Sequence, residues 1–151
     1  MRAVAQRVRS ARVAVDHRVV AAIGRGLCVF AAVGDGDAEA DVAYLAGKLA
    51  GLRVFDDADA PGRMRLGLAE TGGAVLLVPQ FTLYGDVRRG RRPDFGAAAP
   101  PALARRWLAA LAAALRDGGL EVCEGVFGAD MRVDVVNDGP VTILLDSRRL
   151  F

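Results

Sequence analysis

A short polar motif follows an apolar run near the middle of the chain. Gln80, Phe81 and Thr82 come directly after the run that ends at Pro79. A strand that ends here could aim several main-chain N–H groups at one point, and preorganised donors of this kind stabilise the oxyanion of an acyl-transfer reaction. Thr82 also offers a hydroxyl, but a threonine nucleophile needs an adjacent base. The alternative is an ordinary strand end in which Gln80 and Thr82 cap backbone groups.

Conventional catalytic side chains are scarce elsewhere. The chain has one histidine, His17, in an expected turn, and two serines, Ser10 and Ser147, so a Ser/His/Asp triad is not expected. Cys28, Cys123 and His17 do not lie at metal-ligand spacing, and we expect neither a metal nor a cofactor. An enzyme built from this sequence would depend on main-chain groups and on its substrate.

A second motif, Asn137-Asp138-Gly139-Pro140, interrupts an apolar region near the end of the chain. These residue types favour a surface hairpin turn, which is one interpretation. The other is that Gly139-Pro140 forms a rigid rim. With no side chain on the glycine, such a rim could select a ligand by shape alone.

Arginine dominates the basic residues, since Lys48 is the only lysine among 20 lysines and arginines. Arg88, Arg89, Arg91 and Arg92 cluster between glycine and proline and could contact phosphates. A solvated loop in an arginine-rich protein is the alternative. The net charge of +2 is too small to argue for nucleic acid by itself, and no DNA partner is expected.

Length and composition predict one globular domain over 1–151, since the chain has 151 residues, 53% of them hydrophobic. Cys28 and Cys123 lie in apolar runs and are expected to be buried free thiols. Arginines near the start argue against a secretory signal, and no apolar stretch reaches the length of a membrane span. We therefore expect a soluble, cytoplasmic protein without a membrane partner.

Apolar runs separated by turn residues predict strands and two principal helices. The expected strands are 1–8, 11–15, 18–23, 27–33, 53–55, 74–78, 120–123, 131–136 and 141–146, with a hairpin turn at Asp16-His17 and a polar loop over 56–62. One helix is expected over 38–52 with Asp37 as its N-cap, and the other over 101–117. Only the first helix is expected to cross over between parallel neighbours. This order favours an α+β fold with a compact, barrel-like mixed or antiparallel sheet.

The sequence resembles the D-aminoacyl-tRNA deacylase family over nearly its whole length. The matching segments are MRAVAQRV, LAGKLAGLRVFDD, PQFTLYGDVRRGRRPDF, AAAPP, FGADM and NDGPVTILLD. The family usually has serine where this chain has Pro79, and a related animal branch has proline there. Phe81 and Val141, however, match the ordinary branch, so the substitution bears on substrate preference more than on reaction type.

The resemblance implies a homodimer that hydrolyses the ester between a D-amino acid, or glycine, and the 3′ end of tRNA. Gln80, Phe81 and Thr82 match the substrate pocket. Gly139-Pro140, which follows Asn137, matches a cis Gly-Pro element that enters the partner's site and excludes L-amino acids, and Arg7 matches the arginine that holds it. The family mechanism uses main-chain donors and the 2′-hydroxyl of the tRNA.

Three other interpretations remain open. The chain could be a tRNA-binding module without catalysis, using Arg88–Arg92. It could be a structural dimer with no RNA partner, in which both motifs are turns. It could also be a related editor of a small misacylated L-amino acid, which Pro79 suggests.

Overall fold

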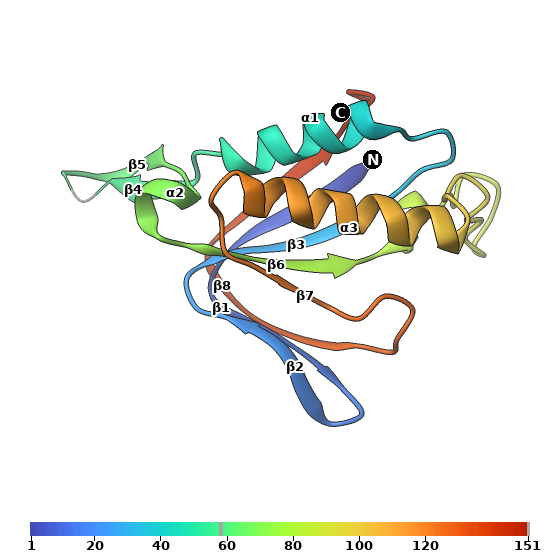
Figure 1. Ribbon diagram of the computed structural model, residues 1–151, viewed down its shortest axis with the longest axis horizontal. Helices are drawn as coiled ribbons and strands as arrows, with labels where there is room; N and C mark the ends of the chain where they lie inside the picture. The colour runs from blue at the N-terminus through green and yellow to red at the C-terminus, as the bar shows by residue number, and fades with distance from the viewer. Residues whose placement is uncertain (58, 151) are drawn as a thin grey trace.

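The computed structural model describes residues 1–57 and 59–150, and it contains one curled mixed sheet covered by two helices (Figure 1). The strands of the main sheet are β1 (Arg2–Val15), β2 (Arg18–Ile23), β3 (Gly26–Ala32), β6 (Ala74–Pro79), β7 (Val122–Glu124) and β8 (Arg132–Asp146). The principal helices are α1 (Glu39–Ala50) and α3 (Pro101–Asp117). The predicted barrel-like α+β fold is therefore confirmed.

Strand order explains why the sheet is mixed. The path runs β2-β1-β3-β6-β7, and β8 pairs with β1 off this path. β1 is antiparallel to β2, β3 and β8, whereas β6 is parallel to both β3 and β7. Both helices thus lie in connections between parallel neighbours. The expectation that only the first helix makes a crossover is wrong, because α3 lies in the long connection from β6 to β7.

Two strands are longer than the sequence predicts. The expected strands 1–8 and 11–15 form the single strand β1, and 131–136 and 141–146 form the single strand β8. The polar residues between these expected strands do not end a strand. They lie where the pairing of β1 with β8 is irregular, since its register shifts between Gln6 and Ser10. The hairpin turn at Asp16-His17 is confirmed, and both residues have positive φ, as a tight hairpin turn requires.

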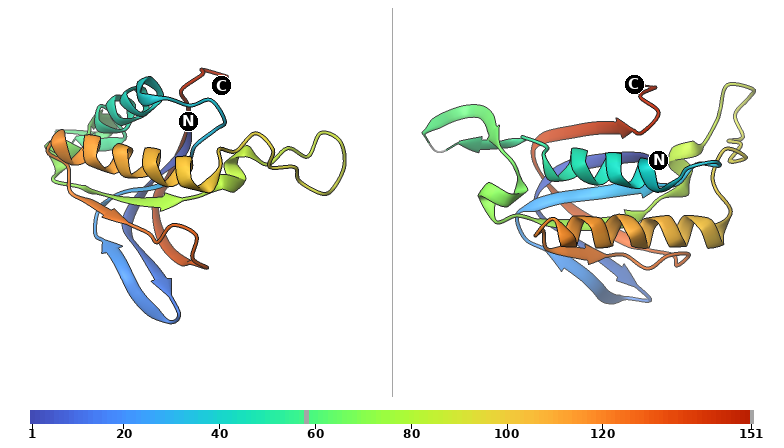
Figure 2. Two further views of the ribbon diagram at one scale, coloured as in Figure 1. Left: turned by 45° about the vertical axis from the view of Figure 1, so that its right-hand side comes forward. Right: turned by 45° about the horizontal axis from the view of Figure 1, so that its top comes forward.

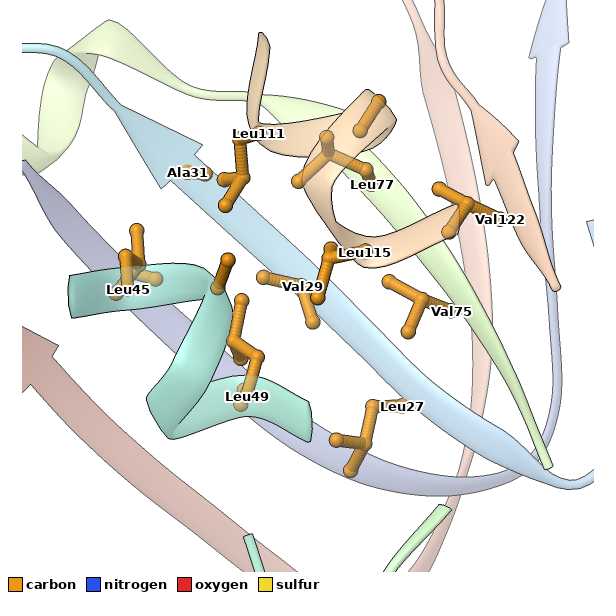
Figure 3. Close-up of a cluster of buried hydrophobic side chains, with 14 of the residues drawn as sticks. Leu27, Val29, Ala31, Leu45, Leu49, Val75, Leu77, Leu111, Leu115 and Val122 are labelled. Carbon is orange, nitrogen blue, oxygen red and sulfur yellow. The ribbon is translucent and has the colours of Figure 1, made fainter. Parts of the chain in front are cut away.

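Helices α1 and α3 lie side by side over one face of the sheet (Figure 2). Side chains of that face alternate with those of the other face along each strand. Leu27, Val29 and Ala31 of β3 point toward the helices and meet leucines of both, among them Leu49 and Leu111 (Figure 3). The opposite, concave face holds a second buried cluster that includes Val13, Cys28, Leu76 and Val78. Curvature thus lets the sheet bury both faces.

The start of α1 differs from the prediction. Ala38, not Asp37, is the N-cap, and the Asp41 carboxylate accepts a hydrogen bond from the Ala38 N–H at 2.8 Å. Asp37 is buried and accepts a hydrogen bond from the Gly34 N–H at 2.5 Å instead. The Asp37 carboxylate therefore stabilises the chain before the helix. The N–H of the N-cap residue is satisfied by Asp41, which lies in the first turn of the helix.

The segment between the first helix and β6 contains more regular structure than the sequence predicts. It contains a two-stranded sheet of β4 (Phe55–Asp57) and β5 (Ala60–Leu66), and a short helix α2 (Leu68–Thr71). The expected polar loop 56–62 therefore overlaps both strands, although residue 58 lies outside the described residues. Charged residues fill this hairpin because it projects from the body and is largely exposed (Figure 1).

Both cysteines are free, as predicted, but only Cys28 is buried and Cys123 is half-buried. Burial raises the pKa of Cys28 to about 12, so its thiol stays protonated. Within the described residues, no helix is long and apolar enough to cross a bilayer.

Candidate active site

The motif after β6 forms a short 3-10 helix, η1 (Phe81–Tyr84), that the sequence did not predict. Gln80 anchors its start, because the Gln80 N–H donates to Ala31 O at 2.8 Å. Hydrogen bonds of the turn begin with the Leu83 N–H, which donates to Gln80 O at 3.2 Å. The N–H groups of Phe81 and Thr82 precede that bond and have no acceptor within the turn. They lie where the sequence places candidate oxyanion donors.

The side chains of the motif are accessible. Phe81 is 58% exposed, an unusual state for a large aromatic residue in a folded chain. The Gln80 side-chain amide donates a hydrogen bond to the Thr82 hydroxyl. An amide donor is not a base, so this contact does not activate Thr82 as a nucleophile.

A cavity of about 720 Å³ opens beside this motif and has mainly apolar walls. Pro79, Gln80 and Phe81 form one wall. Other segments supply residues that sequence analysis did not single out: Phe95, Ala98, Ala99, Phe127 and Met131. The Phe95 and Phe81 rings meet edge to face, 5.1 Å between centroids. These residues lie in three matching segments of the resemblance: Phe95 ends PQFTLYGDVRRGRRPDF, Ala98 and Ala99 lie in AAAPP, and Phe127 and Met131 lie in FGADM.

The second motif lies inside β8, so it is not a hairpin turn. Gln6 pairs with Thr142 and Val8 with Asn137, which leaves residues 138–141 of β8 opposite Arg7 alone. The result is a wide bulge with Gly139-Pro140 near its centre. The Gly139-Pro140 peptide bond is cis, and Gly139 has a φ of +121°.

Arg7 is buried against this bulge. Its Nε donates to Asp138 O at 3.0 Å, and its Nη1 donates to Val54 O at 2.6 Å. Carboxylates of Asp56 and Asp138 lie 3.7 and 3.5 Å from the guanidinium. One arginine therefore connects β1, the bulge of β8 and the chain entering β4, and it has charge partners despite its 7% exposure.

The two motifs lie at opposite ends of the sheet within one chain. Arg7, opposite the bulge, pairs with Leu27 at the start of β3, whereas Ala31 near its end pairs with Pro79. These positions on β3 are separated by about 13 Å, at roughly 3.3 Å per residue. The fold thus brings Gln80, Phe81 and Thr82 together in one place and Arg7, Asn137, Gly139 and Pro140 together in another.

The basic segment forms a projecting loop after η1 (Figure 2). Paired backbone hydrogen bonds between Asp86 and Asp94 close it. Arg88 binds the Asp86 carboxylate through its Nε and Nη2, at 2.9 and 2.6 Å, and this hydrogen bonding lowers the pKa of Asp86. In the described part of the chain, no ion pair engages Arg89, Arg91 or Arg92, so three guanidinium groups remain available to an outside anion.

Metal ligands do not gather in the structure, since the described residues contain no group of three or more His, Cys, Asp or Glu side chains suited to an ion.

Comparison with known proteins assigns the chain to a family. The sequence model for D-Tyr-tRNA(Tyr) deacylase matches residues 4–146. The chain belongs to the D-Tyr-tRNA(Tyr) deacylase family. The resemblance inferred from the motifs is thereby confirmed. D-aminoacyl-tRNA deacylases from Anaeromyxobacter dehalogenans and Thermotoga petrophila are 58% and 53% identical to it, each over 100% of both chains.

Solved structures agree with the deacylase fold. One, described as a c-Myc DNA unwinding element binding protein, is 36% identical with a TM-score of 0.90, over 97% of this chain and 98% of that one. Another, described as a probable eukaryotic D-amino acid tRNA deacylase, has a TM-score of 0.79 at 20% identity, over 95% of this chain and 97% of that one. The second likeness concerns the fold alone.

Proposed function

We propose that this protein is a hydrolase that cleaves the ester of D-aminoacyl-tRNA, and of glycyl-tRNA, to free amino acid and tRNA. The observation that best supports this reaction is the match to the deacylase family across residues 4–146. Main-chain donors stabilise the transition state in this mechanism, because the site offers amide N–H groups and the described residues that line the cavity include no His, Asp or Glu that could act as a base. Such an enzyme acts where aminoacyl-tRNA occurs, in the cytoplasm.

In this mechanism the ester carbonyl lies against the N–H groups of Phe81 and Thr82. Negative charge that develops on this oxygen in the transition state is stabilised by these donors. The 2′-hydroxyl of the terminal ribose assists the reaction, so that the substrate supplies the group that the side chains lack. The apolar walls beside Phe81 exclude water from the developing charge, which strengthens each hydrogen bond.

Selectivity arises by rejection in a homodimer. Gly139-Pro140 of one protomer faces the Gln80–Thr82 site of its partner, where the side chain of an L-amino acid would clash and that of a D-amino acid would point away. The separation of the two motifs along β3 supports this arrangement, because one chain cannot bring its own pair together. β8 also has an exposed edge with exposed apolar residues, Val136 and Leu144, which is typical of a strand that a partner covers.

Arg89, Arg91 and Arg92 bind phosphates of the tRNA beside the site, and Arg88 shapes their loop through Asp86. Loop and site adjoin, since the loop begins directly after η1. Phosphate contacts of this kind position the substrate without reading its sequence.

The decisive experiment compares hydrolysis of D-tyrosyl-tRNA, L-tyrosyl-tRNA and glycyl-tRNA by the purified protein. We expect rapid release of D-tyrosine and glycine and background release of L-tyrosine. Salt-sensitive tRNA binding without any hydrolysis would favour a binding module instead. Equal rates for the D- and L-tyrosyl esters would overturn the selectivity mechanism.

A second candidate function follows from Pro79, which lies at the end of β6 and lines the cavity. Here the enzyme edits a small misacylated L-amino acid, such as an alanyl ester on a wrong tRNA. The same assay extended to L-alanyl-tRNA separates the two, because only the editor releases L-alanine above background.

A further inference from the structure

The far end of η1 is held by Arg2, which lies at the start of β1. The Arg2 guanidinium donates to Leu83 O at 3.0 Å and lies over the Tyr84 ring, 4.5 Å from its centroid. Its Nε also donates to the Asp146 carboxylate at 3.0 Å. Because the side chain of Asp146 is 2% exposed, this carboxylate fixes the guanidinium in a single place. Arg2 therefore ties the last two residues of η1 to β1 and β8.

Tyr84 in turn occupies a slot above Gly34. A Cβ at position 34 would lie 2.5 Å from the Tyr84 hydroxyl oxygen, so only glycine leaves room for the ring. The hydroxyl lies 3.4 Å from the buried Asp37 carboxylate. Burial and this carboxylate raise the pKa of Tyr84, so the phenol stays neutral. The Tyr84 ring is thus in contact with the Arg2 guanidinium and packs closely against Gly34.

The strand end that forms this slot also holds another part of the cavity wall. Gly34 forms an antiparallel bridge with Ala98, and the Ala99 N–H donates to Val33 O at 2.9 Å. Ala98 and Ala99 line the same cavity as Phe81. Gly34 therefore contacts both the Tyr84 ring and, through its bridge to Ala98, a second segment of the cavity wall.

We propose that Arg2, acting through Leu83 and Tyr84, is a positioning residue that sets the direction of the Phe81 and Thr82 N–H groups. This inference rests on the proposed function of those groups as oxyanion donors. A four-residue 3-10 helix has few hydrogen bonds of its own to resist rotation. The Gln80 N–H fixes its start on β3, and Arg2 fixes its end. Without Arg2 the far end of the turn keeps only the Tyr84 ring in its slot, and the direction of the donors is less well defined.

Geometry explains why the residue is an arginine. The guanidinium contacts a carboxylate, a carbonyl oxygen and an aromatic face together, which its planar fork of donors permits. A lysine ammonium at position 2 could keep the charge pair and one further contact. Methionine keeps a similar stem and loses every donor. Comparison of the two replacements therefore separates the polar contacts from packing.

The test uses the full-length protein and two readouts. Arg2→Met is expected to lower kcat on D-tyrosyl-tRNA by about tenfold or more, because small misplacements at a reacting centre are costly. KM should change by less than about threefold, since the donors act mainly in the transition state. Hydrogen–deuterium exchange of the peptide that contains Phe81–Tyr84 should become faster. Arg2→Lys should recover part of kcat and part of the protection of this peptide from hydrogen–deuterium exchange.

Arg116→Met is the matched control. Arg116 also donates to a carbonyl and a carboxylate, Val122 O and Glu124, but at the far end of α3. Its loss should lower thermal stability as Arg2→Met does while leaving kcat and exchange over η1 unchanged. Tyr84→Phe should keep kcat near the wild-type value, and Tyr84→Leu should behave like Arg2→Met, because the ring and not the hydroxyl meets the guanidinium.

Two results would overturn the positioning role. One is a kcat loss in Arg2→Met no greater than in Arg116→Met. The other is unchanged exchange of the η1 peptide. Failure of the proposed function has a different signature, namely wild-type protein that does not hydrolyse D-tyrosyl-tRNA at all.

Discussion

The guanidinium of Arg7 occupies the space next to Gly139 that a side chain at position 139 would need. A Cβ built on Gly139 lies 3.2 Å from Arg7 Nη2, and 2.9 Å from a methyl group of Val141. The two residues are 132 positions apart in sequence, yet each restricts what the other can be. The bulge of β8 and the arginine that supports it therefore form one unit.

Replacing Arg7 by methionine should weaken discrimination between D- and L-tyrosyl-tRNA. The bulge loses the donor to Asp138 O, and Val54 O loses its partner as well. Leaving the buried Val54 carbonyl and the partly buried Asp138 carbonyl unsatisfied should also lower the free energy of unfolding by about 2 kcal/mol or more. The measurements are the ratio of kcat/KM for the two esters and urea denaturation.

Arg9→Met provides the control for this change. Arg9 lies on the same strand and pairs with the same Asp138, at 3.3 Å, but its side chain is 76% exposed. Its loss should cost less than about 1 kcal/mol and leave the ratio unchanged. An unaltered ratio in Arg7→Met would show that the arginine supports folding and not selectivity.

Gly139→Ala should distort the bulge and relax the selectivity. The added methyl meets Val141 and Arg7, and the φ of +121° is unfavourable for alanine. Gly119→Ala is matched to it, since Gly119 has a φ of +83° and open space around the Cβ position. Both variants should lose stability, but only Gly139→Ala should raise the rate of L-tyrosyl-tRNA hydrolysis. Equal substrate ratios in the two variants would contradict a selective role for the bulge.

Thr82 allows the hydroxyl to be separated from the main-chain donor. Thr82→Ala removes the hydroxyl and should lower kcat by less than about tenfold, whereas loss of a true nucleophile removes on the order of 10⁶. Thr82→Pro removes the N–H and should lower kcat on the order of 10²–10³. Single-turnover hydrolysis of D-tyrosyl-tRNA measures both. Background activity in Thr82→Ala would make the hydroxyl the nucleophile and refute the main-chain mechanism.

Mixed dimers test whether the site is shared. A Gly139→Ala chain keeps an intact Gln80–Thr82 segment, and a Thr82→Pro chain keeps an intact Gly139-Pro140 bulge. If the bulge acts on the partner's site, co-expressed and co-purified heterodimers should hydrolyse D-tyrosyl-tRNA and reject the L-ester again. Activity with the relaxed selectivity of Gly139→Ala would mean that each chain uses its own bulge.

The basic loop should contribute to tRNA affinity through charge. Converting Arg89, Arg91 and Arg92 to glutamine should reduce the slope of log K against log salt by about 2, at roughly 0.7 per contact with a single strand. Arg88→Gln should change the slope less, because Arg88 is already paired with Asp86. Filter binding across a salt series measures this, with duplex DNA as competitor. An unchanged slope in the triple variant would place the RNA elsewhere.

The sequence reveals the two motifs but not the secondary structure that surrounds them. Asn137-Asp138-Gly139-Pro140 has the composition of a turn, and only its pairing opposite Arg7 makes it a bulge within a continuous strand. That pairing depends on β1, which is remote in sequence, so no local pattern could reveal it. Gln80–Thr82, by contrast, can be recognised from the sequence, because its polar residues directly follow an apolar run that ends a strand.

The residues of the cavity walls also cannot be predicted from local sequence patterns. Phe95 and Phe127 lie in segments without secondary-structure periodicity, and they reach the site because β3, β6 and α3 bring their segments there. Apolar residues in irregular segments carry no local sign of their role. By contrast, periodic patterns predicted α3 and the buried strands well, because burial on one face imposes a regular spacing.

The opposed positions of the two motifs have a kinetic consequence for the proposed dimer. A lone chain would possess a catalytic half and a discriminating half that cannot meet, so fidelity would rise with protein concentration. Progressive dilution in the assay would then raise the rate of L-tyrosyl-tRNA hydrolysis relative to that of the D-ester around the dissociation constant of the pair. Accuracy in such a system would be a collective property, governed by how much of the protein the cell maintains.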